Sequence, residues 1–142
     1  MQAIYDFGYQ YKQSALLQNI CNEIAVIRKN YEFPSSSLDL DHLRDVANCA
    51  KFVSPDDIIS LITAATIESY QLKRGDELKV LYQELKGVRS QCARPPLLVD
   101  LTFLQSVSEM ETFIAPNEII KLVNDTNKEI NAIIESFWIV VN

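Results

Sequence analysis

The stretch LDLDHLRDVANCAKFVSPDDIISLI, residues 38–62, recurs as VDLTFLQSVSEMETFIAPNEIIKLV at residues 99–123, with an offset of 61 and no gap. Nine of the 25 aligned positions are identical, and most of the others are similar in character, such as Val53 against Ile114. A fixed internal period is the signature of a repeat architecture. We therefore expect two copies of one structural unit.

The same offset holds upstream of this block, where identity fades but the apolar pattern survives. Each copy has apolar residues at i, i+3, i+4, i+7, i+10 and i+14, which is the stripe of an amphipathic helix. The two stripes are Leu17, Ile20, Cys21, Ile24, Ile27 and Tyr31, and Leu78, Leu81, Tyr82, Leu85, Val88 and Cys92. The repeats therefore cover about residues 10–70 and 71–131, followed by a helical extension to residue 142.

Local signals divide each copy into three helices. Ser14, Asp39 and Asp76 are candidate N-caps, because their side chains can accept hydrogen bonds from the first backbone N–H groups of a helix. Pro55 suits the first helical turn, and Gly75 suits a helix end. The expected helices span about residues 14–31, 39–52, 55–73, 76–90 and 97–112, with the last starting at Pro116.

These expectations define the fold class. At 142 residues, with 48% apolar and 23% charged residues, the chain has the composition of one globular domain, 1–142. We expect an all-α fold, either a six-helix bundle or a short superhelix, made of two tandem three-helix repeats with a period of 61. Phe52 and Phe113 should occupy equivalent places, half-buried or buried, before their proline-led helices.

Both ends of the chain are rich in apolar residues. Aromatic residues occupy every second position from Tyr5 to Tyr11, which fits a short extended arm or a poorly formed first helical turn. Five apolar residues in a row, 137–141, include the only tryptophan, and this run is too short to span a bilayer. We expect Phe137 and Trp138 either to be covered by the aromatic arm or to form a self-association or docking patch.

Candidate chemistry is sparse. His42 is the only histidine, and its counterpart in the second copy is Phe103, so a structural role is favoured over a catalytic one. The three cysteines, Cys21, Cys49 and Cys92, share no motif spacing and read as reduced core thiols, which indicates the cytoplasm or another reducing compartment. Phosphate-loop, HExxH, CxxC and EF-hand motifs are all absent from the sequence. We predict no catalytic, metal or cofactor site and no secretory signal.

Cations gather in one segment. Residues 73–94 hold six lysines and arginines against three acids, although the net charge of the chain is -6. Lys79, Lys86 and Arg89 lie away from the apolar stripe of their predicted helix. This face is either a solvated surface or a cationic patch for an acidic partner.

The favoured function is a non-catalytic protein-interaction or regulatory module, such as an accessory subunit of a larger assembly. Its candidate contacts are Lys79, Lys86, Arg89, Phe137 and Trp138. The expected partner is a protein or a second copy of the chain, bound in a groove between the repeats or at these residues. An alternative is a nucleic-acid-associated accessory protein using residues 73–94, which the acidic net charge disfavours. A third is a small-ligand-binding or enzymatic bundle.

Overall fold

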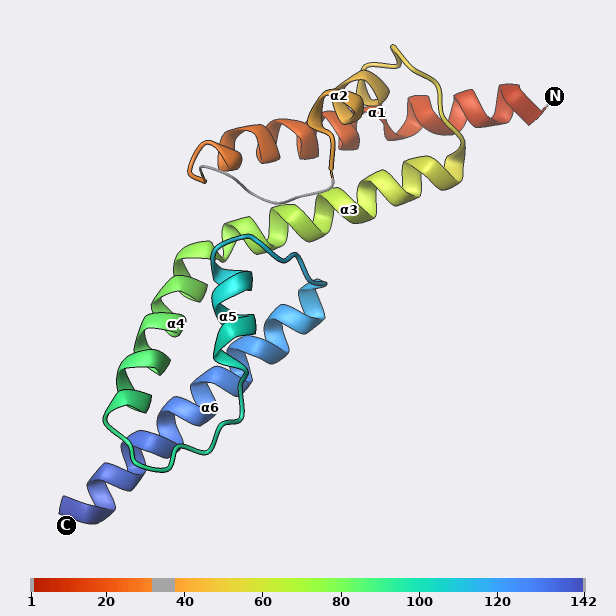
Figure 1. Cartoon of the computed structure of the whole chain (residues 1–142). Coiled ribbons are helices and arrows are strands. Elements are labelled where there is room, and N and C mark those ends of the chain that lie inside the picture. Colours follow the sequence, from red (N-terminus) through yellow and green to blue (C-terminus); the bar gives the residue numbers. More distant parts are fainter. Residues whose placement is uncertain (1, 32–37, 142) are drawn as a thin grey trace. The chain divides into compact units, whose positions relative to one another are not determined.

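The computed structural model describes the backbone of residues 2–31 and 38–141 and the side chains of residues 7–31 and 38–137. Within these ranges the chain forms helices and no strands, which confirms the predicted all-α class (Figure 1). The helices are α1 (Gln2–Arg28), α2 (Leu40–Ala47), α3 (Pro55–Lys73), α4 (Gly75–Ser90), α5 (Leu101–Ser108) and α6 (Pro116–Val141). They form two compact units, unit 1 (Met1–Leu72) and unit 2 (Lys73–Asn142).

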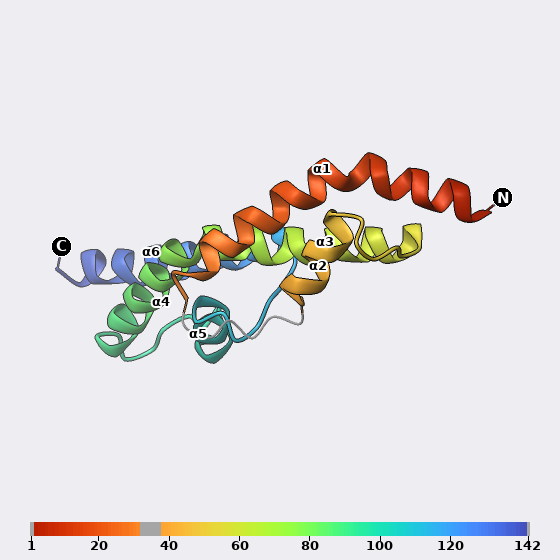
Figure 2. The same ribbon diagram turned by 90° about the horizontal axis from the view of Figure 1, so that it is seen from above.

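In unit 1 the long helices α1 and α3 run in the same direction, and the short α2 runs against them (Figures 1 and 2). Hydrogen bonds fix this arrangement at both ends of α2. Gln10, in the first half of α1, donates to the carbonyl of Val46 near the end of α2. Arg28, at the end of α1, donates to the carbonyl of Leu38 just before α2 and to Glu68 near the end of α3. In unit 2, α4, α5 and α6 have the same relative directions.

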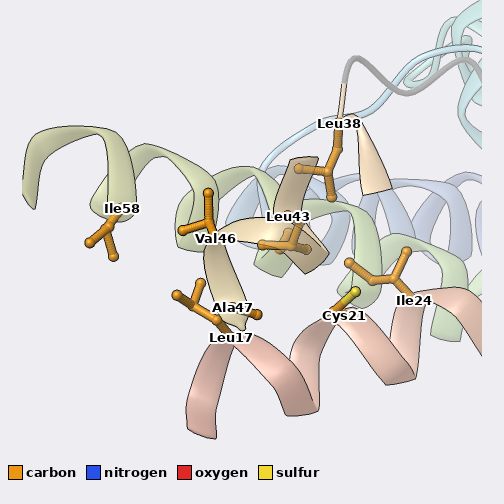
Figure 3. Packing of buried hydrophobic residues seen from close by; sticks show 9 residues of the cluster. Leu17, Cys21, Ile24, Leu38, Leu43, Val46, Ala47 and Ile58 are labelled. Atoms are coloured by element: carbon orange, nitrogen blue, oxygen red, sulfur yellow. The ribbon is translucent and has the colours of Figure 1, made fainter. Parts of the chain in front are cut away.

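The predicted stripes form the core of each unit. Figure 3 shows side chains of α1 facing those of α2, of the start of α3 and of the residue Leu38 just before α2. The labelled residues are Leu17, Cys21, Ile24, Leu38, Leu43, Val46, Ala47 and Ile58. The most deeply buried apolar residues of unit 2 are Leu78, Leu85, Leu104, Val107, Met110, Ile119 and Ile133. Each fully buried aliphatic side chain stabilises the fold by about 1.5–3 kcal/mol, so these stripes hold each unit together.

The short helices α2 and α5 each begin after an aspartate N-cap. Oδ1 of Asp39 accepts hydrogen bonds from the backbone N–H groups two and three residues later, at 3.0 and 3.2 Å. Asp100 makes the same two bonds at the same distances. Both residues have extended backbones, with ψ of 109°, as N-cap residues do. The predicted cap at Asp39 is confirmed.

Both short helices end earlier than predicted, because each closes in a Schellman motif. Cys49 has a positive φ of 59°, its N–H donates to Val46 O at 3.1 Å, and the N–H of Ala50 donates to Asp45 O at 2.8 Å. Met110 has a φ of 61°, its N–H donates to Val107 O at 3.2 Å, and the N–H of Glu111 donates to Ser106 O at 2.9 Å. The left-handed residue turns the chain out of the helix, so the expected ends near residues 52 and 112 are wrong.

Glycine at these two positions should have opposite consequences. A non-glycine residue in the left-handed region costs about 1–2 kcal/mol, which glycine would relieve. Met110 is fully buried whereas Cys49 is partly exposed, and removing a buried methionine side chain costs about 2–5 kcal/mol. We expect Met110→Gly to lower the free energy of unfolding in urea and Cys49→Gly to leave it unchanged or raise it. Equal losses in both variants would contradict the Schellman assignment.

The N-terminal prediction is wrong. The first helix begins at Gln2, not near Ser14, and Ser14 is no N-cap, because its Oγ donates to the carbonyl of Ala47 at 2.6 Å. Phe7 and Tyr11 lie one helical turn apart and pack on the ring of Phe52, with centroids at 4.4 and 5.9 Å. Helical i, i+4 spacing, rather than the alternation, therefore organises these described aromatic residues.

Four further expectations need correction. Gly75 does not end a helix but is the first residue of α4, and Arg74 rather than Asp76 precedes it as N-cap, without a side-chain cap bond. Helix α5 begins at Leu101 instead of residue 97. Phe52 is 44% exposed, in contrast to the half-buried or buried place expected for it. The prediction that long helices begin at Pro55 and Pro116 is confirmed.

Candidate functional site

A buried ion pair connects α4 to α6 in unit 2. Arg89, in the last turn of α4, meets Glu129 of α6 through two hydrogen bonds, Nε to Oε2 at 2.6 Å and Nη2 to Oε1 at 2.8 Å. The two side chains are 14% and 0% exposed. A two-point guanidinium–carboxylate contact combines strength with directional specificity, so it fixes the relative position of these two helices.

The same two side chains hold the chain segment that precedes α5. Nη2 of Arg89 donates to the carbonyl of Val99, and the N–H of Val99 donates to Oε1 of Glu129 at 3.0 Å. The N–H of Leu98 also interacts with the Glu129 carboxylate. Asp100 then caps α5. The buried Arg89–Glu129 pair, which we call the platform, thus fixes consecutive backbone groups before α5.

Residues 94–98, Arg-Pro-Pro-Leu-Leu, form a loop on this platform, which we call the leucine loop. Leu97 and Leu98 are 65% and 52% exposed. Leu97 has a φ of 56°. This left-handed conformation is unusual for a bulky residue, because its side chain crowds the backbone. Prolines 95 and 96 restrict the chain just before it. The loop therefore presents two leucine side chains to solvent from a restrained backbone.

Unit 1 has a corresponding ion pair. Arg28 binds Glu68 through Nε and Nη2, both at 2.7 Å, and Nη2 also donates to the carbonyl of Leu38 at 2.9 Å. The two side chains are 22% and 1% exposed. The segment that the offset of 61 aligns with the leucine loop, residues 33–37, lies outside the described residues, and its sequence is Phe-Pro-Ser-Ser-Ser. The two leucines at this place in the repeat thus occur in the sequence of unit 2, whereas unit 1 has serines there.

The ion pair shifts the pKa values of both Arg89 and Glu129. Hydrogen bonding to Glu129 raises the pKa of Arg89, against the effect of burial. Burial works to raise the pKa of the Glu129 carboxyl, but the hydrogen bonds from Arg89 and from the N–H groups of Val99 and Leu98 outweigh it and hold the pKa below its ordinary value. Glu129 is therefore ionised in the folded chain at neutral pH.

The lowered pKa predicts how stability depends on pH. A carboxyl with a depressed folded pKa contributes stability that is complete above its unfolded pKa of about 4.3 and is lost as pH falls through the folded pKa. The free energy of unfolding of wild type should therefore exceed that of Glu129→Gln at pH 7, and the difference should shrink below about pH 4. Urea titrations of both proteins across this range provide the measurement. A difference that stays constant down to pH 3 would contradict an ionised Glu129.

A pocket of about 300 Å³ lies between α5 and α6 in unit 2. Its lining combines apolar and charged side chains: Phe103, Ile114, Glu118, Lys121, Leu122 and Asp125. Phe103 is 40% exposed even though it is aromatic. The volume is at the lower end of the range of about 300–1,000 Å³ that is usual for ligand pockets.

The residues that the sequence suggested for partner binding are dispersed. Lys79 and Lys86 are exposed on α4, and Nζ of Lys86 lies 5.9 Å from the ring centroid of Tyr82. Arg89 is mostly buried under the leucine loop, which corrects its expected place on an open cationic face. Phe137 is partly buried in the last turns of α6, and the side chain of Trp138 lies outside the described residues.

The leucine loop was missed because residues 97–112 read as one helix. Two signals in the sequence indicate the loop. Prolines 95 and 96 come directly before the leucines, and the offset of 61 aligns Leu97 and Leu98 with Ser36 and Ser37. An apolar pair aligned with a serine pair differs from most core positions of the repeat, which hold large apolar residues in both copies.

Other kinds of site receive no support from geometry. His42 is partly exposed at the start of α2. Among the described residues, no three His, Cys, Asp or Glu side chains are grouped so that they could hold a metal ion. In the same part of the chain, no helix combines the length and apolar character that crossing a bilayer requires.

Comparisons of this chain with protein families, with curated proteins and with solved structures find no match.

Proposed function

We propose that the chain is a non-catalytic protein-interaction module and that the leucine loop of unit 2 is its contact surface. The observation that carries this proposal is that two exposed leucines directly precede Val99, whose backbone is hydrogen-bonded to Arg89 and Glu129. Strained backbone at a bulky residue persists only where the surroundings hold it, and such strain is typical of functional positions.

The physical argument is one of preorganisation. Binding through a flexible loop loses affinity, because the loop must be ordered on association. Here the carbonyl and N–H of Val99 already have partners, and prolines 95 and 96 limit the rest of the loop. Leu97 and Leu98 could therefore bury their side chains in a partner at little conformational cost, and apolar burial is the main favourable term in most association.

Unit 1 and unit 2 are, in this proposal, tandem copies of one three-helix unit with a period of 61. Support comes from equivalent contacts at that offset: the ion pairs Arg28–Glu68 and Arg89–Glu129, and the caps Asp39 and Asp100. The left-handed residues Cys49 and Met110 are also separated by 61. Such duplication gives one copy freedom to acquire a binding loop while the other keeps a polar one.

The double variant Leu97→Ser/Leu98→Ser tests the loop, because it introduces the residues found at positions 36 and 37. Both leucines are exposed, so the free energy of unfolding should change by no more than about 0.5 kcal/mol per substitution. We expect the tagged variant to recover at least about tenfold less of its partner than wild type from the native host, because two anchor side chains are lost. Quantitative mass spectrometry after affinity capture measures this ratio.

The matched control is Val80→Ser on α4. Val80 is 56% exposed and belongs to the same unit, but it lies on a regular helix. This variant should capture as much partner as wild type. If the loop variant also captures as much, or if both variants lose the partner equally, the leucine loop is not the contact surface.

A further inference from the structure

We propose that the leucine loop of one copy of the chain seats in the α5–α6 pocket of a second copy, so that the protein self-associates through unit 2. The inference rests on the proposed function, because it assigns a partner to the same loop. It also gives a role to the pocket, which the loop alone leaves unexplained.

The lining of the pocket suits a leucine side chain. Phe103, Ile114 and Leu122 supply its apolar wall. Its volume of about 300 Å³ would hold one or two aliphatic side chains. Leu97 and Leu98 are the adjacent, exposed aliphatic side chains that the described chain offers on a loop.

Charge complementarity favours a second copy as the occupant. The pocket rim carries two acids, Glu118 and Asp125, against one cation, Lys121. The leucine loop carries Arg94, which is exposed, three residues before Leu97. A cation beside the inserted leucines would face a rim of net negative charge, and such complementarity sets the orientation and the partner of an interface.

Both halves of this contact occur in unit 2, and the sequence of unit 1 differs from it at both loop leucines and at the aromatic residue of the pocket. The offset of 61 aligns Phe103 with His42, and Leu97 and Leu98 with serines. Because each copy offers one loop and one pocket, two copies can exchange loops about a two-fold axis. Such an isologous contact closes on itself and gives a dimer rather than a filament.

Sedimentation of the full chain measures the association directly. Small interfaces bind weakly, so the protein should be followed from about 10 µM to about 1 mM. We expect wild type to shift from monomer towards dimer in this range, and Leu97→Ser/Leu98→Ser and Phe103→His to remain monomeric. Circular dichroism of each variant separates a lost contact from a lost fold.

A charge exchange keeps the inference falsifiable without altering the apolar wall. Arg94→Glu alone should weaken dimerisation about tenfold or more by placing like charges together, and so should Asp125→Lys alone. The double variant Arg94→Glu/Asp125→Lys should return the dissociation constant to within about threefold of wild type, because the opposed charges are restored.

Each outcome decides between the two proposals. A wild type that stays monomeric to about 1 mM, or a charge exchange that fails to restore the dimer, overturns self-association. The proposed function then stands if the Leu97→Ser/Leu98→Ser variant still loses its partner from the host, since a different protein with apolar and basic groups would be the occupant. Dimerisation of wild type that the loop substitution does not affect places the interface elsewhere and also overturns the inference.

Discussion

Replacing Arg89 with methionine should lower the free energy of unfolding of the chain by about 3–5 kcal/mol, because the change leaves a fully buried carboxylate without its partner. Glu129 is 0% exposed and receives two hydrogen bonds from the guanidinium. Urea denaturation followed by circular dichroism gives the measurement. A variant as stable as wild type would show that Glu129 is not held by this pair.

Two controls sharpen the test. Arg44→Met removes a surface pair with Asp41, whose side chains are 48% and 91% exposed, and such pairs contribute about 0–1 kcal/mol. The double variant Arg89→Met/Glu129→Leu should recover part of the loss, because no buried charge remains. It should not recover all of it, because the carbonyl and N–H of Val99 lose their partners. The remaining deficit measures how much the platform stabilises the leucine loop.

Ile58→Pro should destabilise unit 1 by about 3 kcal/mol or more through the backbone alone. The N–H of Ile58 donates to the carbonyl of Ser54 at 3.0 Å, the first hydrogen bond of α3, and proline removes that donor. The side chain is also fully buried, so part of the total loss comes from packing.

The variant Ile58→Ala separates these two contributions. It keeps the N–H and loses only packing, which costs about 2–5 kcal/mol for a buried isoleucine. Ile58→Pro should unfold at a lower urea concentration than Ile58→Ala. Pro55→Ala should remain close to wild type, because the N–H of the first helical residue has no hydrogen-bond partner within the helix. If the proline and alanine variants at Ile58 unfold together, α3 does not begin at Pro55.

The starts of α2, α3 and α6 could be predicted from the sequence because they depend on local chemistry. Asp39 needs only its own carboxylate and the next backbone N–H groups to cap α2. Pro55 likewise acts through its fixed φ and its missing N–H. The apolar stripes were equally readable, since a period of 3.6 requires no knowledge of the partner surface.

Features that depend on distant partners could not be read in this way. Arg89 looks like any other cation in residues 73–94, and its burial follows from Glu129, 40 residues further along. Glu68 and Glu129 recur at the offset of 61, but a glutamate on a helix usually faces solvent. Their burial becomes intelligible only when each is paired with the arginine that also recurs.

The ends of α2 and α5 were predicted wrongly for a different reason. Cys49 and Met110 adopt left-handed backbones that usually belong to glycine, so the sequence contains no stop signal there. The leucine loop was missed at the start of α5, because a helix extended back to residue 97 includes Leu97 and Leu98 in its apolar face. The aromatic residues near the N-terminus were misread because alternation over a few residues also fits one face of a helix.

The most direct test of the account is photo-crosslinking from the leucine loop in the native host. A photoreactive leucine analogue at position 98 of the full chain should form adducts with a protein partner, whether a second copy or another protein. The same analogue at position 80, where Val80 is similarly exposed at 56% against 52% for Leu98, should give few or none. Adducts from position 80 but not from position 98 would contradict the assignment of the leucine loop as the contact surface.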